Sequence, residues 1–139
     1  LKRLRRWFAR SDIGLPENAA AHLPQLDFHA VTGFLNGFID LIAAGKNGRV
    51  CVIDYKSNHL GSRLADYGQA AMSAAVSEHH YYLQALIYAV ATARYLKQRR
   101  ALPEYIHVRY LFVRGLNPHG QEGLWCWDIP VSALQEWLE

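Results

Sequence analysis

Residues 45–58 read GKNGRVCVIDYKSN, a turn sequence followed directly by an apolar, β-branched run. Valine and isoleucine favour the pleated surface of a sheet, so residues 49–55 are predicted to form a strand. The turn before it has the length of a three-residue hairpin loop, residues 46–48, in which Gly48 suits the left-handed position. The stretch therefore predicts a β-hairpin whose first strand ends near Gly45.

The register of this hairpin brings two aspartates together. Pairing Gly45 with Arg49 across the turn sets Asp40 directly opposite Asp54. Lys56 follows Asp54 by two residues, and the period of 2 in a strand puts both side chains on one face. Two carboxylates and one ammonium are therefore predicted to share a face at one end of the hairpin.

These three charges suggest a metal site. Charges on an apolar hairpin are costly to bury unless something compensates them. Mg²⁺ prefers hard oxygen ligands, often one or two carboxylates with waters and substrate phosphate, and Asp40 and Asp54 offer such ligands. The backbone carbonyl of Tyr55 is a further candidate ligand. Lys56 would then orient or help to deprotonate an attacking water, so the predicted reaction is phosphodiester hydrolysis.

A structural interpretation competes with the catalytic one. A D-x-K pattern on a strand is more often a salt bridge between the lysine and an aspartate at the end of a sheet. The three residues alone are weak evidence for catalysis. The choice therefore depends on longer motifs elsewhere in the chain.

Composition limits the class of protein. With 139 residues and 51% hydrophobic content, residues 1–139 are expected to form one domain. No segment approaches the roughly 18 apolar residues that cross a bilayer, so a soluble protein is expected. Two cysteines, Cys51 and Cys126, are too few for a disulfide framework and fit a reducing cytoplasm. A net charge of +3 permits a polyanionic partner without identifying one.

The other segments alternate between helix and strand patterns, which predicts an α/β domain. Asp66 and Gln69 have capping-box spacing in front of an alanine-rich helix expected to start near Tyr67. The remaining expected segments are a basic helix over residues 1–10, a loop over 11–26, an apolar segment over 28–43, a helix over 81–98, strands over 107–115 and 124–129, and a short helix after Pro130.

Several conspicuous residues have ordinary explanations. His79 and His80 are adjacent, so they diverge and are expected in a turn between helices and not in a zinc site. Trp125 and Trp127 are expected to belong to the core, and stacking on nucleic-acid bases is the less favoured alternative. Four cations near the end of the long helix fit a solvated face and the negative end of the helix dipole better than a DNA contact: Arg94, Lys97, Arg99 and Arg100.

Three longer motifs favour the catalytic interpretation. They are GFLNGFIDL at 33–41, VIDYKSNHLG at 52–61 and YYLQALIYAVATARYL at 81–96. The chain from residue 26 to residue 115 resembles the RecB-like branch of the PD-(D/E)xK nucleases, the nuclease domains of the helicase–nuclease subunit of bacterial exodeoxyribonuclease V. The string D-Y-K-S-N followed by Q-x-x-x-Y is specific to that branch.

The resemblance implies a role for each matched position. Asp40 and Asp54 would be metal ligands, and Lys56 would be the catalytic lysine. Gln84 and Tyr88 match the Q-x-x-x-Y motif. Because they are four residues apart on a helix, they would share a face and direct their amide and phenol at the DNA strand or at the catalytic lysine.

Other positions of the family are matched less completely. Three residues lie inside the matched string, and their side chains would contact a backbone phosphate or fix the exit of the strand: Tyr55, Ser57 and Asn58. Family members usually carry an upstream helix that contributes a histidine, and often a glutamate, to the metal site. Neither His22 nor His29 lies in such a segment, and Glu17 lies in a Pro/Gly loop. The chain is expected to begin after that helix.

The resemblance also implies a fold and a function. The fold is a restriction-endonuclease-like mixed sheet flanked by helices, here without its N-terminal helix. The function is a Mg²⁺-dependent or Mn²⁺-dependent exodeoxyribonuclease that degrades DNA unwound by a helicase in the bacterial cytoplasm during double-strand break repair. Single strands and linear duplex ends would be substrates, RecC-like and RecD-like subunits partners, and no membrane is involved.

Two alternatives remain at this point. Related Q-x-x-x-Y nucleases hold an iron–sulfur cluster with four cysteines, and a chain with only two is expected to hold none. The second alternative is a DNA-binding or assembly module of the same fold that performs no chemistry. Metal binding at Asp40 and Asp54 separates that module from an enzyme.

Overall fold

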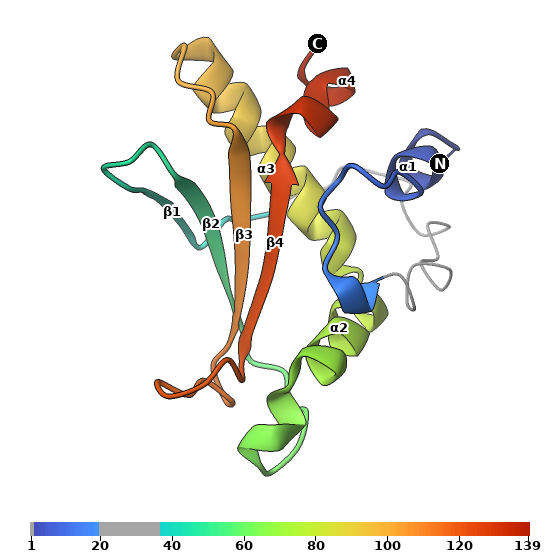
Figure 1. Ribbon diagram of the computed structural model, residues 1–139, viewed down its shortest axis with the longest axis vertical. Coiled ribbons are helices and arrows are strands. Elements are labelled where there is room, and N and C mark those ends of the chain that lie inside the picture. Colours follow the sequence, from blue (N-terminus) through green and yellow to red (C-terminus); the bar gives the residue numbers. More distant parts are fainter. Residues whose placement is uncertain (1, 20–36) are drawn as a thin grey trace.

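A four-stranded mixed sheet forms the centre of the computed structural model, which describes residues 2–19 and 37–139 (Figure 1). The strand order is β1-β2-β3-β4, with bounds Leu41–Ala44, Val50–Lys56, Tyr105–Phe112 and Leu124–Pro130. β2 and β3 are parallel, whereas the two outer pairs are antiparallel. A crossover through two helices therefore joins the central strands, as parallel pairing requires.

Helices α2 and α3 make this crossover and pack on one face of the sheet (Figure 1). The helices are α1 Lys2–Phe8, α2 Gln69–Glu78, α3 Tyr81–Gln98 and α4 Gln135–Leu138, with short 3₁₀ turns at Glu17–Ala19, Leu64–Tyr67 and Val131–Leu134. This arrangement confirms the expected α/β architecture. Within the described residues, no helix is long and apolar enough to span a membrane.

The hairpin has the predicted register. The Gly45 N–H donates to the Arg49 carbonyl at 2.8 Å, and Gly48 has a φ of 78° in the left-handed region. Leu41 pairs with Ile53, so the next position outward sets Asp40 opposite Asp54. Loop length and glycine placement were sufficient to predict this register because both strands must continue directly from the turn.

The start of α2 differs from the prediction. The helix begins at Gln69 with Gly68 as its N-cap, and Asp66 belongs instead to the preceding 3₁₀ turn. The Asp66 carboxylate accepts the backbone N–H of Arg63 at 3.0 Å. Aspartate readily forms such local hydrogen bonds, and this one places the capping box three residues earlier than predicted.

The predicted apolar segment over 28–43 is described only in part, because residues 28–36 lie outside the described residues.

Aromatic rings fill the space between the sheet and the helices. Trp125 and Trp127 on β4 are 0% and 1% exposed, which confirms the expectation that they belong to the core. The Trp125 ring stacks on Tyr110 of β3 at 5.2 Å, and both indoles contact Tyr82 of α3 edge-on. Their position on alternate residues of one strand explains why both rings point at the helices.

Replacing each indole by phenylalanine is expected to destabilise the fold unequally. Trp127 Nε1–H donates to the Ile13 carbonyl at 2.8 Å, whereas Trp125 Nε1–H is buried without a partner in the described residues. Trp127→Phe leaves that carbonyl unpaired, at a cost of about 1–3 kcal/mol that Trp125→Phe does not incur. Urea denaturation measures both free energies of unfolding, and an equal or larger loss for Trp125→Phe would contradict the prediction.

Candidate active site

The end of β2 carries two buried charges on the face that the helices cover. Asp54 and Lys56 are each 6% exposed, whereas Tyr55 between them is 52% exposed on the opposite face. Because side chains alternate along a strand, Asp54 and Lys56 lie on one face and Tyr55 lies on the other, as predicted. Burial places the carboxylate and the ammonium where water does little to screen them.

Asp54 and Lys56 form a short ion pair, with Asp54 Oδ2 and Lys56 Nζ 2.6 Å apart. Burial nevertheless raises the pKa of Asp54 above its usual value, because desolvation outweighs the lysine and the nearby Asp40 charge adds to the rise. Asp128, on the other face of the sheet, shows the opposite balance. Hydrogen bonds from its histidine and arginine partners outweigh burial and lower its pKa. The environment of Asp54 is therefore one that favours a further cation.

Asp40 lies in a bend just before β1 and is exposed. Its Oδ2 accepts the backbone N–H of Tyr55 at 3.0 Å, which fixes the carboxylate beside the end of β2. The N–H and C=O groups of one strand residue point to the same side, so the Tyr55 carbonyl faces the edge where Asp40 lies. The three predicted metal ligands thus meet at one edge of the sheet.

Gln84 and Tyr88 on α3 continue the network from Lys56. Lys56 Nζ donates to Gln84 Oε1 at 2.6 Å, and Gln84 Nε2 donates to the Tyr88 hydroxyl at 3.1 Å. The Tyr88 hydroxyl donates in turn to the Phe38 carbonyl at 2.7 Å, two residues before Asp40. The Gln84 amide is thus directed at the lysine, whereas the Tyr88 phenol reaches it only through Gln84, and a contact of either with DNA stays a prediction.

Ser57 and Asn58 make contacts that fix the exit of β2. The Ser57 backbone carbonyl accepts from Arg114 Nε at 2.8 Å. Asn58 Oδ1 accepts the Tyr81 hydroxyl at 3.2 Å. These bonds tie the loop after β2 to the turn after β3 and to α3. Only the Asn58 bond uses the side chain, so the structural alternative has support for Asn58 and stays a prediction for Ser57. Contact of either side chain with a phosphate stays a prediction.

The donor set fits a hard divalent cation. Repulsion between the Asp40 and Asp54 carboxylates contributes to the raised pKa of Asp54, and a cation between them would remove it. Over residues 2–19 and 37–139, no cluster of three or more acidic, histidine or cysteine side chains is present. Mg²⁺ needs only one or two protein carboxylates, since waters and phosphate oxygens complete its shell. His22 and His29, which the sequence did not support as ligands, lie outside the described residues.

Two aromatic residues at this site were not predicted. Lys56 Nζ lies 3.6 Å from the ring centroid of Tyr81 and 4.5 Å from that of Tyr110. Tyr81 precedes Gln84 by three residues on the same helix, and Tyr110 is the β3 partner of Asp54. Helical spacing therefore offered a signal for Tyr81, whereas Tyr110 required the pairing of β2 with β3.

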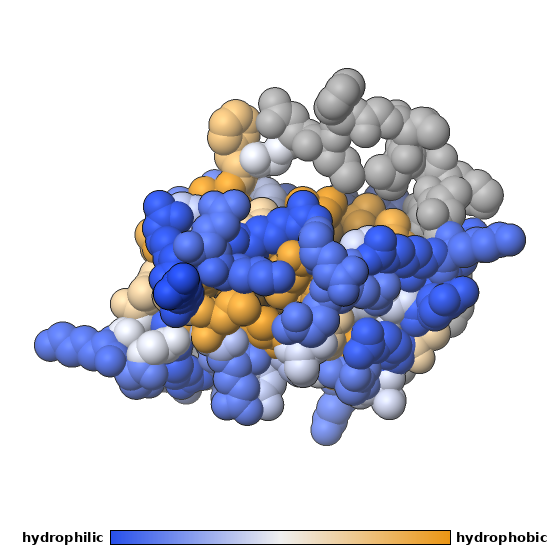
Figure 2. All heavy atoms as spheres, turned by 90° about the horizontal axis from the view of Figure 1, so that it is seen from above, coloured by the Kyte–Doolittle hydropathy of each residue, from blue (hydrophilic) through white to orange (hydrophobic). Residues whose placement is uncertain are grey.

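The basic end of α3 makes contacts within the chain. Arg94 Nε donates to the Trp137 carbonyl at 2.8 Å, and Lys97 Nζ donates to the Leu138 carbonyl at 3.1 Å. Figure 2 shows the molecule from above the view of Figure 1. Most residues on this face are hydrophilic, and they surround a smaller hydrophobic area. Two of the four cations thus satisfy carbonyls of α4, in keeping with the structural interpretation of this helix end.

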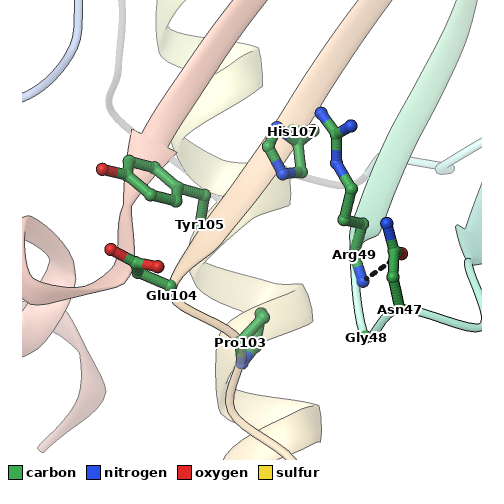
Figure 3. Close-up of a pocket in the computed structure, with 7 residues that line it drawn as sticks. All are labelled: Asn47, Gly48, Arg49, Pro103, Glu104, Tyr105 and His107. Atoms are coloured by element: carbon green, nitrogen blue, oxygen red, sulfur yellow. Dashed lines mark hydrogen bonds between the residues drawn. The ribbon is translucent and has the colours of Figure 1, made fainter.

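A hollow of about 290 Å³ lies at the opposite end of β2, between the hairpin turn and the start of β3 (Figure 3). Arg49, Glu104 and His107 are among the residues that line it. The His107 ring is held at Nδ1 by Asp128 at 2.7 Å. This hollow contains none of the predicted site residues, which lie at and beyond the other end of β2.

Asp40→Asn is expected to lower the pKa of Asp54, because it removes the negative charge of Asp40, which contributes to the rise. A raised folded-state pKa makes ionisation of Asp54 cost stability as the pH rises above the unfolded value of about 3.9, and the variant reduces that cost. Carboxyl ¹³C NMR titration without divalent ions measures the pKa. Asp12→Asn, in an exposed pair with Arg10, is the control. An unchanged pKa of Asp54 in Asp40→Asn would refute the coupling.

Comparison with known proteins agrees with this geometry. The sequence profile of the PD-(D/E)XK nuclease superfamily matches residues 2–125. The chain is 44% identical over 111 residues to RecBCD enzyme subunit RecB of Escherichia coli (strain K12), covering 76% of this chain and 9% of that protein. It is 42% identical over 121 residues to the same subunit of Haemophilus influenzae, covering 81% of this chain and 10% of the relative.

A more distant relative gives the same result. RecBCD enzyme subunit RecB of Mycobacterium tuberculosis (strain ATCC 25618 / H37Rv) is 41% identical over 123 residues, covering 77% of this chain and 11% of the relative. The chain thus spans about a tenth of the length of each of these three proteins. Similarity over most of the chain therefore concerns one small part of much longer subunits.

Proposed function

This chain belongs to the PD-(D/E)XK nuclease superfamily, and we propose that it hydrolyses phosphodiester bonds in DNA at a metal site formed by Asp40 and Asp54. The observation that carries the proposal is the buried pair of Asp54 and Lys56, 2.6 Å apart, with Asp40 beside it. An exposed salt bridge usually lowers the pKa of its carboxyl group, whereas burial raises the pKa of Asp54 here despite the lysine. Such an electrostatic cost is typical of functional sites.

Asp40, Asp54 and the Tyr55 carbonyl would hold the metal, which we propose to be Mg²⁺, with Mn²⁺ as a substitute. When bound, the ion supplies Lewis-acid chemistry, making water a stronger nucleophile at neutral pH and offsetting negative charge on the phosphate. Lys56 would donate a hydrogen bond to an oxygen of the reacting phosphate or water. Its distance of 2.6 Å to Asp54 keeps that donor beside the carboxylates.

Gln84 holds the lysine in place. Its amide oxygen accepts from Lys56, and its amide nitrogen is directed at Tyr88, so the amide has one favoured orientation. The Tyr88 hydroxyl in turn donates a hydrogen bond to the Phe38 carbonyl. This chain of bonds gives the Q-x-x-x-Y pair a positioning role in the reaction, since a displacement of about 1 Å can cost 10²-fold in rate.

The larger assembly extends the proposal. The relatives are named as subunits of the RecBCD enzyme, so we propose that this domain, residues 1–139, acts in a helicase–nuclease complex of that type. Its substrates would be single strands released by unwinding and linear duplex ends. RecC-like and RecD-like subunits would be its partners, in double-strand break repair and the degradation of linear DNA in bacteria. The corresponding activity is that of an ATP-dependent exodeoxyribonuclease V.

Cleavage of labelled single-stranded and linear duplex DNA with Mg²⁺, with Mn²⁺ and with EDTA tests the proposal. The same assay on a longer chain, extended at its amino-terminal side, shows whether upstream residues complete the site. Cutting that requires a divalent ion supports the nuclease. Absence of cutting by either chain, together with retained DNA binding, would favour a binding or assembly module.

A further inference from the structure

The Lys56 ammonium is enclosed by four groups from three elements. Asp54 Oδ2 and Gln84 Oε1 each lie 2.6 Å from Nζ. The ring centroids of Tyr81 and Tyr110 lie 3.6 Å and 4.5 Å from the same atom. The lysine side chain is 6% exposed, so these groups replace most of its water.

Each of these groups favours a cation. Carboxylate and amide oxygens accept N–H bonds, and the negative face of an aromatic ring attracts an ammonium more strongly when water is excluded. An ammonium has three N–H donors, of which Asp54 and Gln84 accept two. One donor remains for an oxygen outside this set. The rings can thus hold the charge of Lys56 without using all of its hydrogen bonds.

The Tyr81 ring is itself held on several sides. Its hydroxyl donates to Asn58 Oδ1 at 3.2 Å, and the His79 ring stacks on it with centroids 5.4 Å apart. Its backbone carbonyl accepts the Tyr110 hydroxyl at 2.8 Å. His80, in the left-handed conformation with a φ of 57°, makes the sharp turn that starts α3 at Tyr81. Such a conformation is unfavourable for a non-glycine residue and is often found near functional sites.

We propose that Tyr81 is a positioning residue for the nuclease reaction, whose ring holds the Lys56 ammonium against Asp54. The inference rests on the proposed function of this site. Tyr110 contributes a second ring, but it is 0% exposed and stacks on Trp125 in the core, so its replacement would disturb the fold. Tyr81, at the start of α3 and only partly buried, can be varied with less damage.

The kinetic test compares three variants in the metal-dependent cleavage assay. Tyr81→Leu removes the ring and is expected to lower kcat about tenfold with little change in KM for DNA. Tyr81→Phe keeps the ring, loses only the bond to Asn58, and is expected to retain kcat within about twofold. Tyr95→Leu removes another ring of α3, one that contacts Arg99 at the exposed surface, and should leave kcat unchanged. A wild-type kcat in Tyr81→Leu, or an equal loss in Tyr81→Phe, overturns the proposal.

A second measurement does not depend on activity. Protons above a ring face resonate upfield, so the terminal methylene protons of Lys56 should shift downfield in Tyr81→Leu and stay in place in Tyr81→Phe, as followed by ¹H–¹³C NMR. An unchanged signal in Tyr81→Leu overturns the placement of the ring. If neither this chain nor its longer form cleaves DNA, the proposed function fails, and the NMR result then decides whether Tyr81 holds Lys56.

Discussion

Lys56→Met is expected to reduce metal-dependent DNA cleavage by about 10²–10³-fold, the usual cost of removing a fixed donor from a developing charge. Methionine preserves much of the length and apolar stem of lysine but has neither its charge nor its donors. Lys56 also lowers the pKa of Asp54, so its loss raises that pKa further. Cleavage is therefore measured over a range of pH, so that the effect of a higher Asp54 pKa is separated from the loss of the lysine donor.

The matched control for this variant is Lys46→Met in the exposed hairpin turn. It removes one positive charge from the same hairpin and should leave cleavage unchanged. DNA affinity, measured with Ca²⁺ in place of Mg²⁺, should differ little between the two variants. Cleavage by Lys56→Met at the wild-type rate would remove the lysine from the mechanism and return the Asp54–Lys56 pair to a structural role.

Asp54→Asn is expected to weaken metal binding by at least about 10²-fold, because loss of residues outside the ligand shell already costs 10–100-fold. The amide keeps the shape of the carboxylate but has no charge and only one oxygen. Isothermal titration with Mn²⁺ measures the affinity, and cleavage should be lost in parallel. Lys56→Met should lose cleavage and still bind the ion, which separates the two roles.

Asp128→Asn provides the control for the metal-binding experiment. Asp128 is also on a strand, and it also contacts basic side chains, His107 and Arg109, but on the opposite face of the sheet. Its replacement should leave Mn²⁺ affinity unchanged. If Asp128→Asn weakened binding and Asp54→Asn did not, the metal site would lie on the other face, and the assignment to Asp40 and Asp54 would be wrong.

Two predictions made from local sequence had different outcomes. The register that sets Asp40 opposite Asp54 was predicted from a three-residue loop and one glycine. The start of α2 was wrong because Asp66 bonds to Arg63 instead of capping the helix. Several local hydrogen-bonded turns compete within a few residues there, and their free energies differ by little.

Local periodicity was sufficient to place Asp54 and Lys56 on one face and to place Gln84 and Tyr88 on one side of α3. These relations depend only on the repeat of a strand or a helix. The meeting of the two pairs required the folded chain, because Lys56 and Gln84 are separated by 28 residues and touch only when α3 packs on the sheet. The same packing brings Tyr81 and Tyr110 to the ammonium and produces the burial that raises the pKa of Asp54. The local sequence therefore determines which charged residues share a face. Distant segments determine their electrostatic environment, because those segments exclude water from the site.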